Sequence, residues 1–361
     1  MNNVKRYEWA DFARGLLMIL VFIYHSEVYY YHEHSYSWIA SPFFLTGFFF
    51  VSGFLFTRDI SKVSPLDKCK QVFRGLVFPY FVFETILAAP KVLSGRADLL
   101  QLILDFFLFR GSWFIVAIGL MQLIYALVLK KKASVKTLVW STVVFFLLGV
   151  LLCTIYKKTF PFYDIVVANR VLYSPELPNR LPFCVNLALL FCPFFALGNL
   201  CRIYEDKFIS FCKTKYLLIS TILYVTLYCI VDHLYIGSWW YCATGSYKNL
   251  TLMMIYALIG VWMVCCYSYL IKSIKPINYI GRNSIIFLFL NSGGLVIISL
   301  IVNKLNILDN SNYLNQLLVA FLATVLVYVA SLFINRFLPL LRGDKNAFNR
   351  WSQKLGINIQ W

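Results

Sequence analysis

Two ionisable side chains in the first long apolar stretch have the types and the spacing to do chemistry. Arg14 lies near the start of the stretch from Trp9 to Tyr31, and His25 lies deep inside it, among Leu, Ile, Val, Phe and Met. On a helix, eleven positions correspond to three turns plus about 20°, so the two side chains share a face roughly 16 Å apart along the axis. Ionisable groups in a membrane span are costly and usually face a protein interior or a wet cavity. This face is therefore the leading candidate for a functional site.

The two side chains suit different parts of a transfer reaction. A neutral imidazole accepts a proton near physiological pH, so His25 is suited to act as a general base on a hydroxyl. The planar guanidinium of Arg14 is suited to binding phosphate, and Asp11 can pair with it across one turn. Two plainer interpretations stay open. His25 could be a hydrogen-bonding residue between helices, and Arg14 could be a cationic anchor on the cytosolic side.

The composition indicates the kind of scaffold that positions these residues. Of 361 residues, 60% are hydrophobic and 14% are charged, whereas soluble domains are about 45–50% apolar and about 25% charged. We therefore expect an all-α polytopic membrane protein with the lipid bilayer as its surroundings. The net charge of +17 does not indicate nucleic-acid binding, because the basic residues are dispersed in short loops between apolar runs. The ten cysteines form no C-x-x-C pair, so we expect no disulfide framework and no metal site.

Apolar runs of about 20 residues, the length that crosses a bilayer, occur ten times. We expect spans at about 10–31, 38–57, 75–93, 113–129, 137–156, 182–201, 216–235, 250–271, 284–303 and 313–334. The loops alternate in charge, with 24 of the 33 Lys and Arg residues in one set and nine in the other. This bias places both termini in the cytosol. We expect a single transmembrane domain, residues 1–334, followed by a basic cytosolic tail, residues 335–361.

Further candidate residues lie in and beside the later spans. Ser52 and Gly53 follow three phenylalanines in the second span, where small residues allow close helix packing or the passage of a ligand chain. Arg74 opens the third span near its cytosolic end. The remaining candidates for contact with a substrate, which are equally suited to pairing with water at the interface, are Glu84, Arg110, Trp113, Asp232 and His233.

Several of these segments resemble the acyltransferase-3 family of integral membrane acyltransferases. The resemblance begins with Asp11, Arg14-Gly15 and His25 in the first span. It continues in the same order through FFFVSGFLF at 48–56, RGLVFPY at 74–80, Trp113-Phe114 with Gln122, FFALGNL at 194–200 and GRNSIIFLFLN at 281–291. The last segment often ends in histidine in that family, and Asn291 stands in that place here. Some relatives carry an added external hydrolase-like domain, which we do not expect in this chain.

The resemblance implies an O-acetyltransferase type of reaction at the plasma (cytoplasmic or inner) membrane. An acyl group, commonly acetyl, would pass from cytosolic acyl-CoA to a hydroxyl of a cell-surface or lipid-linked sugar or polysaccharide. His25 and Arg14 would be the essential residues, with Arg14 and Arg74 at the donor phosphates and Ser52 and Gly53 beside the donor chain. A transporter or flippase for a lipid-linked glycan would also need buried charges, but it does not predict the register of Arg14 and His25. A binding or assembly role in an exopolysaccharide system is a third possibility.

Overall fold

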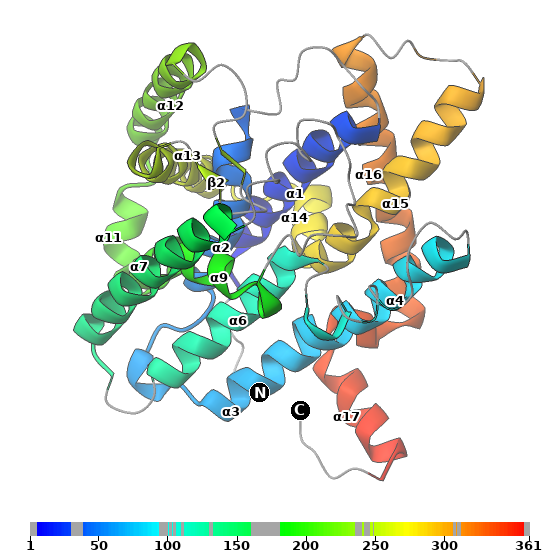
Figure 1. Ribbon diagram of the computed structural model, residues 1–361, viewed down its shortest axis with the longest axis horizontal. Coiled ribbons are helices and arrows are strands. Elements are labelled where there is room, and N and C mark those ends of the chain that lie inside the picture. Colours follow the sequence, from blue (N-terminus) through cyan, green and yellow to red (C-terminus); the bar gives the residue numbers. More distant parts are fainter. Residues whose placement is uncertain are drawn as a thin grey trace. The chain divides into compact units, whose positions relative to one another are not determined.

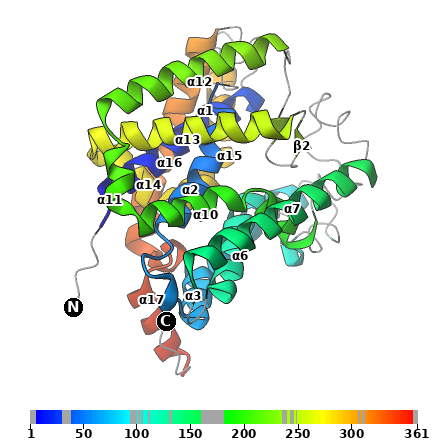
Figure 2. The ribbon, with the colours of Figure 1, turned by 90° about the vertical axis from the view of Figure 1, so that its left-hand side faces the viewer.

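The computed structural model describes residues 6–29, 39–93, 100, 103, 106–109, 112–129, 133–159, 181–234, 240–241, 246–247, 249–305, 308 and 312–356. These residues are almost entirely helical (Figures 1 and 2). The exception is a short antiparallel pair, β1 (Trp240–Tyr241) with β2 (Ser246–Tyr247). The expected all-helical character is confirmed. The chain packs as two compact units, which are described separately below.

The first unit contains Met1–Val51, Tyr204–Ser238 and Asn249–Arg342. Its elements are α1 (Glu8–Tyr29), most of α2 (Ser41–Phe54), α11 (Glu205–Ser210), α12 (Thr214–Leu234), α13 (Leu250–Ile271), α14 (Lys275–Arg282), α15 (Ser284–Leu305), α16 (Tyr313–Phe337) and the 3₁₀ turn η6 (Pro339–Arg342). Helices α12 and α13 lie side by side, as do α15 and α16 (Figures 1 and 2).

Helix α1 lies at the core of this unit because it packs against α13, α14, α15 and α16. Its apolar side chains are buried on several faces, including Phe12, Leu17, Met18 and Phe22, each at most 1% exposed. A helix that is apolar all round is typical of an interior position. Arg14 and His25 are therefore carried by a helix with neighbouring helices packed around it.

The second unit contains Ser52–Ile203, Trp239–Lys248 and Gly343–Trp361. Its elements are the end of α2, η2 (Ile60–Lys62), α3 (Pro65–Val72), the π-helical segment η3 (Phe73–Val77), α4 (Phe78–Leu93), α6 (Trp113–Val128), α7 (Val135–Thr159), η4 (Pro182–Cys184), α9 (Val185–Leu190), α10 (Cys192–Ile203), β1, β2 and α17 (Lys345–Lys354). Helix α7 packs against α9 and α10, and α3 packs against α6.

By length and composition, six of the described helices could cross a membrane. They are Pro65–Ala89, Val135–Ile155, Thr214–Val231, Leu250–Ile271, Ser284–Leu305 and Tyr313–Phe337. A bent pair, Pro182–Leu190 with Cys192–Ile203, would make a seventh. The other three expected spans fall on α1 and on the shorter apolar helices α2 and α6. Each of the ten expected runs therefore falls on a helix. Six or seven of the described helices are long and apolar enough to cross a membrane.

Local sequence explains where two expected boundaries move. The third run begins ten residues earlier than expected, because the Ser64 side chain caps the backbone N–H of Asp67 and Pro65 occupies the first helical turn. The sixth run is bent by 60° between α9 and α10. Pro193 lies at the second position of α10 and has no N–H to bond the preceding turn, so a straight helix cannot continue through it.

The outer faces of the long helices are apolar. Helix α7 exposes Trp140, Val144, Leu147 and Leu151, and each of these side chains is more than half exposed. Helix α16 shows the same pattern at Leu314, Phe321, Val329 and Phe333. Apolar patches of this extent are rare on soluble monomers and are expected where helices face lipid.

Candidate functional site

The segment α14 crosses α1 with the two backbones in direct contact. A Cβ at Gly15 would overlap the carbonyl oxygen of Ile277, and a Cβ at Gly281 would overlap the carbonyl oxygen of Asp11. The absence of side chains at both positions lets the two backbones approach closely. The amide of Asn278 strengthens the crossing by donating from Nδ2 to the Glu8 carbonyl, 2.9 Å away, and accepting from the Ile274 N–H. The crossing fixes α14 against the N-terminal half of α1.

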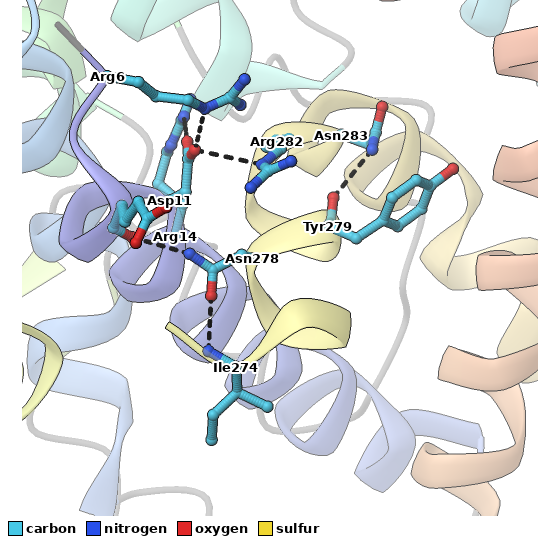
Figure 3. Close-up of polar contacts among 9 residues, drawn as sticks. Arg6, Asp11, Arg14, Ile274, Asn278, Tyr279, Arg282 and Asn283 are labelled. Carbon is cyan, nitrogen blue, oxygen red and sulfur yellow. Dashed lines mark hydrogen bonds and ion pairs between the residues drawn. The ribbon is translucent and has the colours of Figure 1, made fainter. Parts of the chain in front are cut away.

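Asp11 lies at this crossing and is contacted by three arginines (Figure 3). Its carboxylate is buried, with a side chain 5% exposed. Arg14 Nη2 donates to Oδ1 at 2.6 Å, Arg6 Nε donates to Oδ2 at 2.7 Å, and Arg282 Nε lies 3.4 Å from Oδ2. The predicted pairing of Asp11 with Arg14 is thus present. Its position in the first turn of α1 also lets Asp11 interact favourably with the helix dipole.

The three-arginine cluster, defined here as Arg6, Arg14 and Arg282 around Asp11, carries an excess of positive charge. Three permanent cations face one carboxylate, and the Arg6 and Arg282 side chains are 58% and 41% exposed. Arg14 is more deeply held, at 27% exposure, and its Nε is buried with no hydrogen-bond partner among the described residues. A cluster of this charge and accessibility can bind an anion such as a phosphate group.

His25, three turns farther along α1 than Arg14, is placed against α15. Its Nδ1 lies 3.3 Å from Oδ1 of Asn291, which is 2% exposed. One turn nearer the N-terminus of α1, the rings of Phe22 and Phe287 meet edge to face with centroids 6.3 Å apart. The ring of Tyr24 lies next to the imidazole, with centroids 5.6 Å apart, and also packs against Phe44. The imidazole is therefore held by one polar contact within an aromatic environment.

Helix α16 adds a second polar contact beside His25. Gln316 is fully buried, and its Nε2 donates to the hydroxyl of Ser26 at 3.2 Å, while that hydroxyl donates to the Ile23 carbonyl. The Oε1 atom of Gln316 is buried without a hydrogen-bond partner in the part of the chain that the structure describes. This pair ties α16 to the turn of α1 that carries His25, and so limits movement of the imidazole.

The face predicted from helical periodicity is covered by one continuous piece of chain. Arg14 and His25 both lie in the unbroken helix α1. Arg282 of α14 contacts Asp11, and Asn291 contacts His25 from α15, which begins two residues after α14 ends. This arrangement agrees with a shared face, and it places α14–α15 along that face.

Ser52 and Gly53 lie in the second unit, where packing explains their positions. The Ser52 hydroxyl accepts a hydrogen bond from Nε2 of Gln122 at 3.1 Å. A Cβ at Gly53 would overlap the carbonyl oxygen of Phe195 on α10, and Asn199 Nδ2 donates to the Gly53 and Thr57 carbonyls. Gly53 therefore allows α2 and α10 to approach closely.

Arg74 also lies in the second unit, within the π-helical segment η3. Its Nε is buried and has no hydrogen-bond partner among the described residues, and Asp344 interacts with it electrostatically. Gly343, at φ +74°, lies against the Arg74 backbone, where a side chain would collide. Single π-helical turns occur frequently at functional sites. The contacts join the beginning of the expected cytosolic tail to Arg74.

Among the substrate-side candidates, the structure describes the side chains of Glu84 and Trp113. Glu84 accepts hydrogen bonds from the backbone N–H of Ser112, at 3.0 Å, and from the Ser112 hydroxyl, while Trp113 begins α6 as a half-buried residue. The side chains of Asp232 and His233, in the last turn of α12, and all of Arg110 lie outside the described residues. No three described His, Cys, Asp or Glu side chains are placed to hold a metal ion.

Three residues of the site were not singled out from the sequence as partners. Arg6 entered the sequence analysis only through the loop charge bias, Arg282 through that bias and as part of the segment 281–291, and Asn291 only as a departure from a resemblance. The available signal for Arg282 and Asn291 was their position in the segment 281–291, which contains Gly281 and Asn283 as well. Nothing in the spacing along the chain indicates that this segment contacts α1.

The helices and the polar face of α1 define a multi-pass membrane protein, and comparison with known proteins identifies its family. The model of the acyltransferase-3 family, described as an acyltransferase domain, matches residues 7–336. The chain therefore belongs to this family, and the family implies acyltransferase activity in a membrane. The matched region includes α1, α14 and α15, and with them Asp11, Arg14, His25, Arg282 and Asn291; Arg6 lies one position before it. No curated protein and no solved structure matches the chain.

Proposed function

We propose that this protein transfers an acyl group, acetyl in the simplest case, from cytosolic acyl-CoA to a hydroxyl of a cell-surface or lipid-linked sugar or polysaccharide. The observation that carries the proposal is the pair of polar sites on α1, an arginine cluster at Asp11 and an imidazole held by Asn291. One site suits the phosphates of a donor, and the other suits proton transfer. Eleven residues of helix separate Arg14 from His25, roughly 16 Å along the axis.

The three-arginine cluster fits the phosphate groups of coenzyme A. Arg14 has a buried Nε with no partner among the described residues, and Asp11 already orients its guanidinium through Nη2. An oriented arginine offers charge-assisted hydrogen bonds to phosphate oxygens at a smaller entropic cost than a free side chain. Arg6 and Arg282 would add positive charge from the exposed side. For Arg74, Ser52 and Gly53, a role at the donor remains a prediction.

His25 would accept the proton of the acceptor hydroxyl. Acyl-CoA supplies an activated acyl carbonyl, and the residues of this chain bind the donor, exclude water and move the proton. A positioned general base contributes typically about 10² to 10⁴-fold in rate. Holding donor and acceptor in one dry environment contributes further, because a bimolecular encounter becomes effectively unimolecular. Glu84, Arg110, Trp113, Asp232 and His233 remain candidates for binding the acceptor.

The proposal places the protein in the plasma membrane. Its topology has ten spans, with both termini in the cytosol. It is supported by the bias of 24 to nine basic residues between the two sets of loops. It places the three-arginine cluster on the side where acyl-CoA is available. Reporter fusions after Lys130 and after Lys345 should read cytosolic, and a fusion after Arg170 should read external. A cytosolic reading after Arg170 would overturn both the topology and the assigned donor side.

Transfer itself is tested with membranes that contain the overproduced full chain and acetyl-CoA labelled in the acetyl group. Covalent label in a glycan or glycolipid fraction, released by mild base as expected for an ester, would support the proposal. The matched control is membranes containing the His25→Ala protein at the same level. Movement of a lipid-linked glycan without incorporated label would support a flippase instead.

A further inference from the structure

We propose that Asn291 is the positioning residue of His25, and that it holds the imidazole in the tautomer with a proton on Nδ1 and a lone pair on Nε2. Asn291 is the residue that departs from the histidine often present in the family, so no role for it follows from the resemblance. As a statement about catalysis the inference rests on the proposed function. As a statement about the protonation of the ring, it can be measured independently.

The hydrogen-bonding atoms determine the tautomer. Asn291 presents its amide oxygen, which can only accept, to Nδ1 of His25 at 3.3 Å. A hydrogen bond therefore requires Nδ1 to carry the proton. In a neutral imidazole the other nitrogen then has the lone pair. Nε2 becomes the atom that can take a proton from a hydroxyl.

Ser292 makes a second contact with the amide of Asn291. The hydroxyl of Ser292 donates to the same Oδ1 atom at 2.9 Å. The side chain of Asn291 is 2% exposed, so bulk water does not compete for it. One turn earlier on α15, Phe287 is fully buried and packs against Phe22 of α1, which holds the two helices in register at this point. The amide oxygen is thus presented by a rigid part of the unit.

The contact with Asn291 restricts the rotation and the tautomer of the His25 ring. An imidazole that lacks a partner at Nδ1 can rotate and exchange tautomers, so only part of the population presents a lone pair to the substrate. A partner that accepts from Nδ1 removes both freedoms, and the same contact stabilises the ring after it has gained a proton at Nε2. No other described side chain makes a hydrogen bond to His25. The positioning role therefore falls to Asn291.

The test combines a spectroscopic measurement with a transfer assay on the full chain in lipid. The chain has four histidines, so His32→Gln, His34→Gln and His233→Gln leave His25 as the single ring that carries ¹⁵N and ¹³C labels. Solid-state NMR correlation spectra then identify which ring nitrogen is protonated. We expect a protonated Nδ1 and an unprotonated Nε2. A protonated Nε2 in the neutral ring would overturn the inference.

Variants of Asn291 test whether it causes this state. Asn291→Leu removes the acceptor at similar size, so the tautomer with a protonated Nε2 should increase and acyl transfer should fall about 10²-fold, at the low end of the contribution of a positioned base. Asn291→Asp keeps an acceptor at the same place and should restore the tautomer and most of the transfer. Unchanged tautomer and transfer in Asn291→Leu would overturn the inference.

Two further measurements separate this role from folding and from the proposed function. Ser299→Ala changes another buried polar residue of α15, eight positions from Asn291, and should leave the tautomer and transfer as in the wild type. Binding of acyl-CoA should be unchanged in all of these variants. The wild type could transfer no acyl group while the His25 tautomer still differs between the wild type and Asn291→Leu as expected. That result would support the positioning of the ring and contradict the proposed function.

Discussion

The substitution His25→Gln separates a general base from a structural histidine. A glutamine amide can donate to Asn291 Oδ1, as Nδ1 of His25 does at 3.3 Å, but it cannot take up a proton at neutral pH. If His25 only joins α1 to α15, the exchange replaces one neutral hydrogen bond by another. The loss is then at most that of one such bond, about 0.5–1.5 kcal/mol of folding free energy, with little effect on transfer.

If His25 is the base, the loss in rate is much larger. A general base contributes about 10² to 10⁴-fold, which corresponds to about 2.7–5.4 kcal/mol in the activation barrier. His25→Gln and His25→Ala should then be inactive to a similar degree. Neither should weaken acyl-CoA binding, because the three-arginine cluster lies about three helical turns away along α1.

The assay is the initial rate of labelled acetyl transfer in membranes matched for the amount of protein, with acyl-CoA binding measured on the same samples. His32→Gln and His34→Gln serve as controls for the substitution itself and should be tolerated better. Transfer by His25→Gln within about threefold of the wild type, far above the loss expected of a base, would refute the mechanism. The family assignment would be unaffected by that result.

Three other predictions concern the crossing of α1 and α14. Arg14→Lys keeps the charge but loses the planar fork, so it should weaken acyl-CoA binding in detergent, and Arg14→Ala should weaken it further; binding as tight as wild type in Arg14→Ala would make Arg14 a topological anchor only. Gly281→Ala should lower the melting temperature, because its Cβ would overlap the Asp11 carbonyl, whereas Gly293→Ala on α15 meets no atom within 4 Å and should be neutral or stabilising by up to about 1 kcal/mol; equal melting temperatures would contradict the packing. Asp11→Asn should destabilise the protein by about 1.5–3 kcal/mol, the contribution of a hydrogen bond to a charged group, and unchanged stability in thermal unfolding would show that the arginines need no buried anion.

The helices and the register of the site follow from local sequence. Hydrophobic composition predicted the helical membrane fold, and each expected run falls on helix. The period of 3.6 residues placed Arg14 and His25 on one face, and both lie in the unbroken helix α1. The pairing of Asp11 with Arg14 is also local, because residues three apart are neighbours on a helix. These features depend only on residues within a few turns of each other.

Glycines show where sequence reasoning reaches its limit. At Gly53, close packing and the passage of a ligand chain were both open interpretations, and the contact with the Phe195 carbonyl supports packing. Gly15 and Gly281 were noticed only as parts of segments that resemble a family. Their common purpose, the close approach of α1 and α14, depends on which helices become neighbours, and hydrophobic patterning does not specify the neighbour.

The sequence by itself therefore determined that the chain is a helical membrane protein and that one helix carries an arginine and a histidine on a shared face. Only the tertiary structure decided which residues from distant parts of the chain meet that face. Arg282 reaches Asp11, and Asn291, 266 positions from His25, meets its ring. Helical periodicity is set by hydrogen bonds between residues four apart, so it can be read along the chain. Contacts between distant helices depend on the packing of all the helices together, and an asparagine in an apolar run has no periodicity that reveals its partner.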